Sequence, residues 1–238
     1  FVDKMALSEG IPADHEDRIV HGIYYVLARA GTTGHVCGPA NDVYEAVAGL
    51  LNLSAEDVSS IAQTAVDTGE IPSIVYDMER YLYLPYLYEA ETEAALRIKD
   101  MSEDDREIGN ASLAIEKFER EHGFSLEKKQ KEAIKESMKS GVMVITGGPG
   151  TGKTTLIQAI IGAAEQYGVK VKLMAPTGRA AKRLAISSGR NADTIHKALE
   201  ASMRDHGHTY FEKNEAEPLG EDLIIVDEAS MLDISLFY

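Results

Sequence analysis

The chain contains one cysteine and no tryptophan among its 238 residues. A single cysteine cannot form an internal disulfide, and the lack of a disulfide framework is typical of a reducing compartment, which predicts a cytoplasmic protein. Long hydrophobic runs are missing too: no apolar stretch approaches the roughly 20 residues that cross a bilayer, and no secretory leader pattern opens the chain. We therefore expect no membrane partner. Cys37 lies in an apolar-flanked run and is interpreted as a small buried residue rather than a reactive thiol.

Positive charge is scarce, and the shortage is confined to one part of the chain. Residues 1–122 hold 24 Asp and Glu against 9 Lys and Arg, a net charge of −15, whereas residues 123–238 hold 15 of each. An acidic surface repels phosphate backbones unless its basic residues gather on one face. The N-terminal part is thus a poor candidate for non-specific DNA binding and a better one for protein partners, while the neutral part can bind DNA only locally.

The most informative segment that is present covers residues 147–154, Gly-Gly-Pro-Gly-Thr-Gly-Lys-Thr. It matches the phosphate-binding loop pattern G-x-x-x-x-G-K-[ST], between a predicted strand over 142–145 and a predicted helix from 156 to 164. Backbone N–H groups of such a loop and the helix N-terminus attract phosphate oxygens. We expect Lys153 to reach the terminal phosphates and Thr154 to bind Mg²⁺. The other residues predicted to contact the nucleotide here are Gly147, Gly148, Pro149, Gly150, Thr151, Gly152 and Thr155.

A second acidic motif lies about 75 residues downstream. An apolar run over 223–226 predicts a buried strand, and Asp227 and Glu228 follow it directly. A carboxylate at the end of such a strand can hold Mg²⁺ through its water shell, which we assign to Asp227. The next carboxylate, Glu228, is placed to orient or deprotonate an attacking water. Four apolar residues and two acids are weak evidence alone, but they gain weight beside a phosphate loop.

Three further features carry less weight by themselves. The segment 175–184, Ala-Pro-Thr-Gly-Arg-Ala-Ala-Lys-Arg-Leu, follows a predicted strand, so Thr177 and the next helix can hold a nucleic-acid phosphate, or the segment is an ordinary turn before a basic helix. His196 in Thr194-Ile195-His196 is read first as structural. The Gln130 amide can pair with a donor and an acceptor on adenine, or it is a solvated helix residue.

The N-terminal part shows the order helix, short strand, helix, helix, hairpin, which is typical of a winged-helix module. Helices are predicted over 15–30, 42–51 and 55–68, with Asn41 and Ser54 as N-caps, and strands over 35–37, 71–76 and 81–84. The last of the three helices carries acids and no Lys or Arg, so a structural or protein-contact role is favoured over DNA reading. We predict three regions: a winged-helix-like domain over 1–101, a helical linker over 102–123 and an ATPase domain over 124–238.

The C-terminal part alternates helices and strands. Helices are predicted from Ser125 to Ser140, over 179–188 and over 194–203, and strands over 142–145, 169–175 and 223–226. Because the strands are apolar on both faces, we expect an α/β fold with a parallel sheet covered on both sides.

In this order and spacing, GGPGTGKTT, APTGRAAKRL, TIH and IIVDEASML resemble the RecD-like helicases of superfamily 1. The resemblance implies a RecA-like P-loop NTPase lobe and an ATP-dependent DNA helicase of repair and recombination that moves 5′ to 3′. It implies that Gln130 contacts adenine and that Lys153, Thr154, Asp227 and Glu228 serve ATP, Mg²⁺ and water. The residues that it implies near single-stranded DNA are Pro176, Thr177 and His196, and we predict Arg179, Thr194 and Tyr210 as further DNA contacts. A hairpin over 206–211 resembles the family's strand-separating pin, with Tyr210 or Phe211 at its tip, or is a plain surface loop.

The resemblance also implies a second RecA-like lobe with an arginine finger, so we expect this chain to be a fragment that binds nucleotide weakly and hydrolyses it slowly. Within the helicase reading, a stand-alone motor and a relative of the exodeoxyribonuclease V alpha subunit stay open. Two other classes are weighed against it: a P-loop switch or kinase-like transferase that does not act on DNA, and an interaction module with a vestigial loop. The 175–184 and 194–196 segments disfavour the transferase, and the intact set of Lys153, Thr154, Asp227 and Glu228 disfavours decay.

Overall fold

The computed structural model describes residues 5, 7–104, 106–148, 150–203 and 209–238. Its contacts divide the chain into two compact units, residues 1–96 with 233–238 and residues 97–232. Among the described residues, no helix combines the length and the apolar character that a membrane crossing requires.

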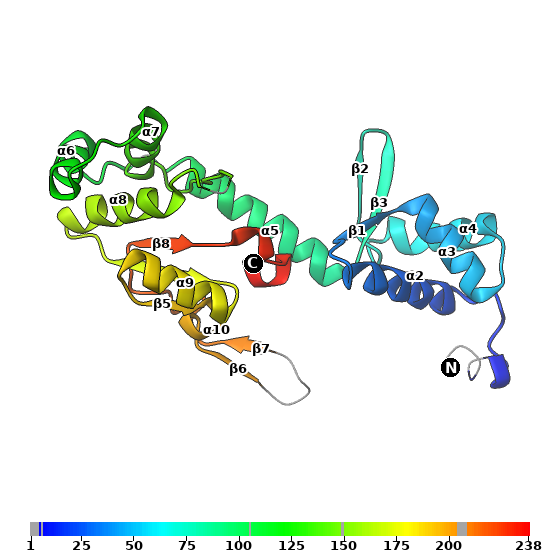
Figure 1. The fold of residues 1–238 in the computed structure, drawn as a ribbon. Helices are drawn as coiled ribbons and strands as arrows, with labels where there is room; N and C mark the ends of the chain where they lie inside the picture. The colour runs from blue at the N-terminus through cyan, green and yellow to red at the C-terminus, as the bar shows by residue number, and fades with distance from the viewer. Residues whose placement is uncertain (1–4, 6, 105, 149, 204–208) are drawn as a thin grey trace. The chain divides into compact units, whose positions relative to one another are not determined.

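The first unit packs three helices against a small antiparallel sheet (Figure 1). The helices are α2 (Glu16–Gly31), α3 (Ala40–Leu51) and α4 (Ala55–Asp67), and the strand order is β1 (Cys37–Pro39), β3 (Glu79–Tyr83), β2 (Ser73–Tyr76). Each helix has an apolar face, and these faces meet in one core with Ile19, Ile23, Val47, Val58 and Leu82 fully buried. The observed element order is therefore the winged-helix order that the sequence predicts.

Two helix starts in this unit test the predicted caps. Ser54 caps α4, because its hydroxyl accepts a hydrogen bond of 3.0 Å from the Asp57 N–H. The prediction of Asn41 as a cap is wrong: α3 begins at Ala40, two residues before the predicted start at 42, and Pro39 takes the N-cap position. The fixed backbone angle of proline ends β1 and leads into the first helical turn, so the helix needs no capping side chain at residue 41.

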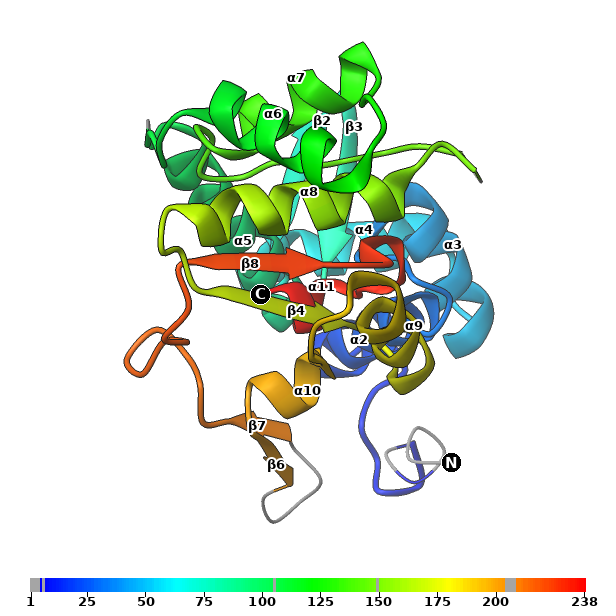
Figure 2. The same cartoon turned by 60° about the vertical axis from the view of Figure 1, so that its left-hand side comes forward.

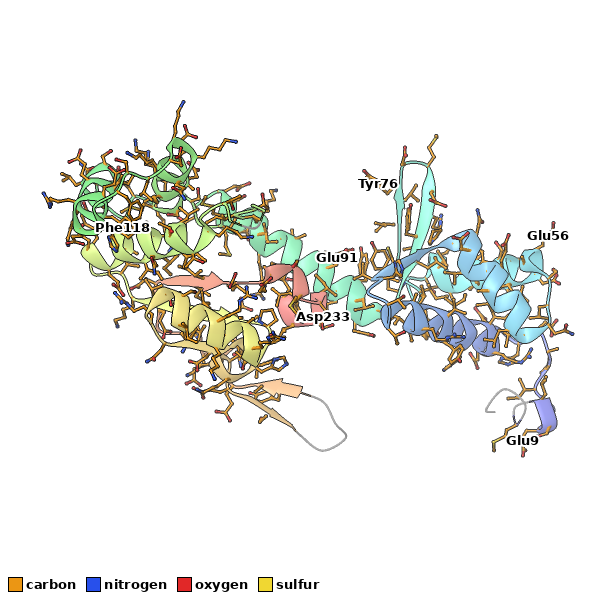
Figure 3. All side chains as sticks on the ribbon, viewed as in Figure 1. Glu9, Glu56, Tyr76, Glu91, Phe118 and Asp233 are labelled. Carbon is orange, nitrogen blue, oxygen red and sulfur yellow. The ribbon has the colours of Figure 1, made fainter. Side chains whose placement is uncertain are left out.

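The first unit also contains the turn of the β2–β3 hairpin, the start of a long helix and one short helix. β2 and β3 are joined by the two-residue turn Asp77-Met78, and the side chain of Tyr76 before it is exposed (Figure 3). Helix α5 (Pro85–Ser102) follows, and the short helix α11 (Ile234–Phe237) belongs to this unit as well. Cys37 in β1 is a half-buried free thiol.

The second unit contains a parallel three-stranded sheet in the order β5 (Ala192–Thr194), β4 (Val171–Ala175), β8 (Leu223–Val226). Helix α8 (Lys153–Gln166) runs along β4 and β8 in Figure 2, and α9 (Gly178–Ser188) connects β4 to β5. Ile161 of α8, Leu173 of β4 and Leu184 of α9 are buried in one cluster, so both helices cover the same face of the sheet. This is the parallel α/β fold that the sequence predicts.

Helices α6 (Ala111–His122) and α7 (Lys128–Ser137) complete the core of this unit. Phe118 of α6 (Figure 3) and Ile134 of α7 are buried in one cluster with Leu156 and Ile160 of α8. The predicted linker over 102–123 thus contributes a helix to this core; the three predicted domain ranges themselves stay a prediction. Helix α7 begins after Glu127, where Glu127 and Gln130 form a capping box, and not at Ser125 as predicted.

The structure corrects three other expectations about the second unit. Residues 142–145 form no strand, because no described strand pairs with them. Val144 in this segment is 83% exposed. The predicted coverage of both sheet faces is wrong at β8, where Ile224 is 46% exposed. The predicted helix over 194–203 is the short α10 (Ile195–Ala198) followed by strand β6 (Ala201–Met203), because Glu200 adopts a positive φ of 54° that stops the helix.

Strand β6 pairs antiparallel with β7 (Thr209–Phe211), which confirms a hairpin in this region. The prediction that Tyr210 or Phe211 lies at its tip is wrong, because the register pairs Tyr210 with Ser202 and Phe211 with Ala201 within the strands. The connecting residues 204–208, where the tip of the hairpin is expected, lie outside the described residues.

Candidate nucleotide and nucleic-acid site

The phosphate loop leads directly into the N-terminus of α8. Gly150 and Gly152 both adopt positive φ, of 73° and 77°, which glycine tolerates and which turns the loop into the helix. A Cβ atom on Gly147 would lie 2.7 Å from Thr151 Oγ1, so a larger residue there would require the Thr151 side chain to move. Gly148 is exposed, and Thr151 Oγ1 donates to its carbonyl oxygen at 2.9 Å. Pro149, predicted to belong to the loop, lies outside the described residues.

Lys153 is the first residue of α8, and its side chain folds back over the loop. The Lys153 ammonium donates a hydrogen bond of 2.6 Å to the carbonyl oxygen of Gly147. Thr154 follows and is exposed, and Thr155 is half-buried. The lysine charge and the first N–H groups of a 14-residue helix therefore converge on one small region, an arrangement that favours an anion.

Gln130 lies beside the phosphate loop. Its side-chain oxygen accepts a hydrogen bond of 3.0 Å from the Glu127 N–H, and its amide nitrogen donates to the Gly152 carbonyl oxygen at 3.5 Å. The amide thus caps α7 and contacts the glycine that precedes Lys153. Pairing with adenine requires the side chain to exchange these partners.

The carboxyl ends of three parallel strands meet at one edge of the sheet. The register pairs Ala175 of β4 with Thr194 of β5, and the N–H of Asp227, just after β8, donates to the Met174 carbonyl oxygen at 3.0 Å. Pro176 and Thr177 continue from β4, so the predicted DNA residues and the predicted acidic pair lie along the same edge. This is the edge at which open α/β sheets bind ligands.

Asp227 and Glu228 are both half-buried at this edge. Asp227 Oδ1 accepts a hydrogen bond of 3.0 Å from the Glu228 N–H, and the Glu228 carboxylate forms an ion pair of 3.1 Å with the Arg183 guanidinium of α9. Sequence reasoning missed Arg183, because 45 residues separate it from Glu228 and only the fold brings them together.

These residues fit a magnesium nucleotide by the chemistry of their atoms. Lys153 and the backbone amides at the start of α8 suit phosphate oxygens, and the exposed Thr154 hydroxyl and the Asp227 carboxylate are hard oxygen ligands of the kind that Mg²⁺ prefers. No cluster of three His, Cys, Asp or Glu side chains suited to a metal occurs in the described part of the chain. A bound Mg²⁺ therefore depends on oxygen atoms of the nucleotide and of water in addition to these two side chains.

The predicted DNA residues lie at the starts of α9 and α10 and on the β6–β7 hairpin. Thr177 caps α9 by accepting a hydrogen bond of 3.3 Å from the Ala180 N–H, and Arg179 is exposed in the first turn of that helix. Thr194 caps α10 in the same way through the Lys197 N–H, which leaves His196 exposed. Tyr210 is 38% exposed on β7. The His196 ring lies 5.9 Å from the ring of Phe211, which joins α10 to the hairpin.

Asp193 forms a second charged group next to this edge. Lys197 and Lys172 donate hydrogen bonds of 2.7 Å and 3.1 Å to its carboxylate, and these contacts, first that with Lys197, lower the pKa of Asp193. Lys172 belongs to β4 and Lys197 to α10, so the two ion pairs with Asp193 link the start of α10 to β4.

The comparisons with known proteins agree with this geometry. Residues 130–238 match the family described as an AAA domain. The ATP-dependent RecD2 DNA helicase of Deinococcus radiodurans is 32% identical over 98% of this chain and 33% of its own length. The RecBCD enzyme subunit RecD of Haemophilus influenzae is 28% identical over 83% of this chain and 33% of its own, and the ATP-dependent DNA helicase dda of phage T4 is 41% identical over 44% and 24%.

The chain thus spans a quarter to a third of the length of these relatives. The similarity to RecD2 extends through the N-terminal unit, and the similarity to dda is confined to less than half of the chain. Together with the phosphate loop, the acidic pair and the parallel sheet, these matches show that the chain belongs to the RecD-like helicases of superfamily 1.

Proposed function

We propose that this chain is the ATP-binding part of a DNA helicase that uses ATP hydrolysis to move 5′ to 3′ along single-stranded DNA in repair and recombination. The observation that carries the proposal is the arrangement of Lys153 and the phosphate loop at the N-terminus of α8 with Asp227 and Glu228 at the end of β8 in the same unit. The names of its relatives, which are helicases and a RecBCD subunit, support the same reaction.

In this proposal each residue of the site has one task. Lys153 leaves the Gly147 carbonyl oxygen and neutralises the terminal phosphates. The backbone N–H groups of the loop contact the phosphates at Gly147, Gly148, Gly150, Thr151 and Gly152. Pro149 and Thr155 are the other proposed nucleotide contacts. Thr154 and Asp227 hold Mg²⁺, which supplies charge neutralisation on the phosphates when bound. Glu228 accepts the proton of the attacking water. Gln130 recognises adenine after exchanging its partners at Glu127 and Gly152.

Single-stranded DNA is the proposed polymer partner, at the sheet edge beside α9. Thr177, Arg179 and the N-terminus of α9 hold a phosphate, and Pro176, Thr194, His196 and Tyr210 line the path of the strand. The first unit is proposed to contact protein partners, since its negative charge repels DNA. A cytoplasmic location accompanies this function. A switch or transferase that does not act on DNA remains the competing function, but it does not require the 175–184 and 194–196 segments at this edge.

The test is the ATPase rate of the full-length protein with and without single-stranded DNA. We expect DNA to raise the rate, and Lys153→Ala to abolish turnover in both conditions. Lys128→Ala, which changes a lysine that is 91% exposed on α7, is the matched control and should behave as wild type. Turnover that is indifferent to DNA would remove the helicase and favour the transferase. Strand displacement on substrates with a 5′ or a 3′ overhang then decides the direction of movement.

A further inference from the structure

The carboxylate proposed to activate water is already engaged by a cation. Glu228 Oε1 accepts a hydrogen bond of 3.1 Å from a terminal nitrogen of Arg183, and the two groups form an ion pair. An oxygen atom that accepts a guanidinium N–H has one acceptor position fewer for a water molecule, and the ion pair holds the carboxylate toward α9. The contact therefore opposes the role that the proposed function gives to Glu228.

The backbone fixes where the Glu228 side chain starts. Glu228 has a φ of 55° and a ψ of 39°, in the left-handed region that non-glycine residues seldom adopt. Its N–H donates to Asp227 Oδ1, and its carbonyl oxygen accepts from the Met231 N–H at 3.0 Å, so both sides of the residue are held. A strained and doubly anchored backbone at a candidate catalytic residue indicates a side chain whose direction matters.

Arg183 comes from the helix that begins at the proposed DNA phosphate site. Thr177 caps α9, and Arg183 lies in the second turn of that helix. Its side chain is 71% exposed, whereas that of Glu228 is 36% exposed. A guanidinium has five N–H donors in a planar fork that suits phosphate as well as carboxylate. The arginine is thus accessible to a phosphate of a strand that lies along α9.

We propose that Arg183 is a positioning residue that restrains the Glu228 carboxylate while no DNA is bound, and that a phosphate of the bound strand takes over its guanidinium. Glu228 is then released to accept a proton from the attacking water, whose oxygen bonds to the γ-phosphorus as the bond to ADP breaks. This inference rests on the proposed function. It makes the Arg183–Glu228 ion pair the link by which DNA binding raises the rate of hydrolysis.

The exposure of the pair limits the size of the effect. Exposed ion pairs shift an equilibrium by no more than about fivefold. Loss of the guanidinium should therefore raise the DNA-free turnover of ATP by about two- to fivefold and reduce the stimulation by saturating DNA by the same factor. If DNA stimulates the wild-type ATPase by more than about fivefold, contacts other than the Arg183–Glu228 ion pair contribute to the stimulation as well.

The experiment measures kcat and KM for ATP in the full-length protein, without DNA and at saturating single-stranded DNA. Arg183→Ala should raise kcat without DNA and leave kcat with DNA unchanged, with the KM for ATP unaltered in both. Arg183→Lys, which keeps the charge but not the fork, should lie between wild type and Arg183→Ala. The matched control is Arg190→Ala, which removes an exposed arginine from a comparable ion pair of 2.7 Å with Glu165 in the same unit and should leave both rates unchanged.

The outcomes separate this inference from the function on which it rests. A wild-type protein without DNA-stimulated ATPase overturns the proposed function and this inference with it. A stimulated wild type in which Arg183→Ala leaves the DNA-free rate unchanged, or lowers it, overturns the inference alone. A urea-unfolding cycle with Arg183→Ala, Glu228→Gln and the double variant measures the ion pair independently of turnover, and additive effects would also overturn the inference.

Discussion

At the scale of single residues, Gly109 of the second unit combines a positive φ with a close aromatic neighbour. Gly109 has a φ of 126°, and a Cβ atom there would lie 2.7 Å from the Tyr167 ring, whose hydroxyl donates to the Asn110 carbonyl oxygen at 3.0 Å. We predict that Gly109→Ala lowers the free energy of unfolding by about 2–3 kcal/mol, because both the backbone and the ring must shift. Urea unfolding followed by circular dichroism measures this change.

The control for that substitution is a glycine in a helix. At Gly162 in the middle of α8, a new Cβ would lie 3.9 Å from Phe118, an ordinary contact. Gly162→Ala should stabilise the protein by about 0.5–1 kcal/mol, since alanine favours a helix interior. Equal effects of the two substitutions would show that the approach of Tyr167 to Gly109 is not a constraint.

Asp193 gives the residue-scale prediction on pH. Its pKa is lowered by the hydrogen bonds from Lys197 and Lys172, so the folded state favours the ionised carboxylate. A lowered carboxyl pKa contributes stability above the unfolded pKa of about 3.9, and this stability is lost as the pH falls through the folded pKa. We expect Asp193→Asn to unfold at lower urea concentration than wild type at pH 7, by under about 1 kcal/mol because the pair is partly solvated.

The pH series decides whether the ion pairs cause that difference. The gap between Asp193→Asn and wild type should shrink as the pH falls below about 4, where wild type also loses the charge. Glu56→Gln, an exposed change in α4 of the other unit, should show no such dependence. A gap of constant size down to pH 2.5 would assign the effect of Asp193→Asn to packing instead.

At the scale of elements, the β2–β3 hairpin contains a turn that its sequence disfavours. Asp77 and Met78 have φ values of 51° and 63°, as the two central residues of a type I′ turn require, and glycine is preferred at such positions. Met78 is 97% exposed, so its side chain gains little from packing. We predict that Met78→Gly stabilises the protein by about 0.5–1 kcal/mol, because the left-handed cost exceeds the added flexibility of the unfolded chain.

Thermal or urea unfolding of Met78→Gly checks this prediction, and Met78→Ala is its control. Alanine removes the same long side chain but keeps the Cβ atom, so it should unfold as wild type does. If alanine stabilises as much as glycine, the cost comes from the exposed methionine side chain and not from the backbone of the turn.

The elements also show what the sequence can predict. Helices α2, α4 and α9 follow from apolar spacing and local caps, such as Ser54, which depend only on neighbouring residues. The run at 142–145 has the composition of a buried strand, but a strand also requires a hydrogen-bonded neighbour, which no local pattern reveals. Helix α10 is short because Glu200 adopts a left-handed backbone conformation. A glutamate does not favour that conformation, so the sequence does not predict where the helix ends.

At the scale of the whole molecule, the candidate site combines short motifs that could be predicted with contacts that could not. Lys153, Thr154, Asp227 and Glu228 follow from spacing in the chain, because their chemistry is carried by contiguous residues. The Arg183–Glu228 ion pair and the contact of Gln130 with Gly152 join segments 45 and 22 residues apart, and side-chain geometry alone reveals them. The motifs therefore predict which atoms take part, and the fold shows how they restrain one another.

The uneven charge of the chain leads to the last prediction, on how strongly DNA binding depends on salt. The N-terminal half carries the whole net charge of −15, so phosphate contacts should come from a few basic residues near α9. For single strands, the logarithm of the association constant falls with the logarithm of the salt concentration with a slope of about −0.7 for each phosphate neutralised. We expect a slope of about −1 to −3 for this chain.

Fluorescence anisotropy of labelled oligothymidine across a salt series measures this slope. Arg179→Ala should make the slope shallower by about 0.7, whereas Arg29→Ala, an exposed change on α2, should leave it unchanged. Equal changes in both variants would mean that the strand also contacts the acidic unit, and its charge would then have to be screened by basic residues gathered on one face.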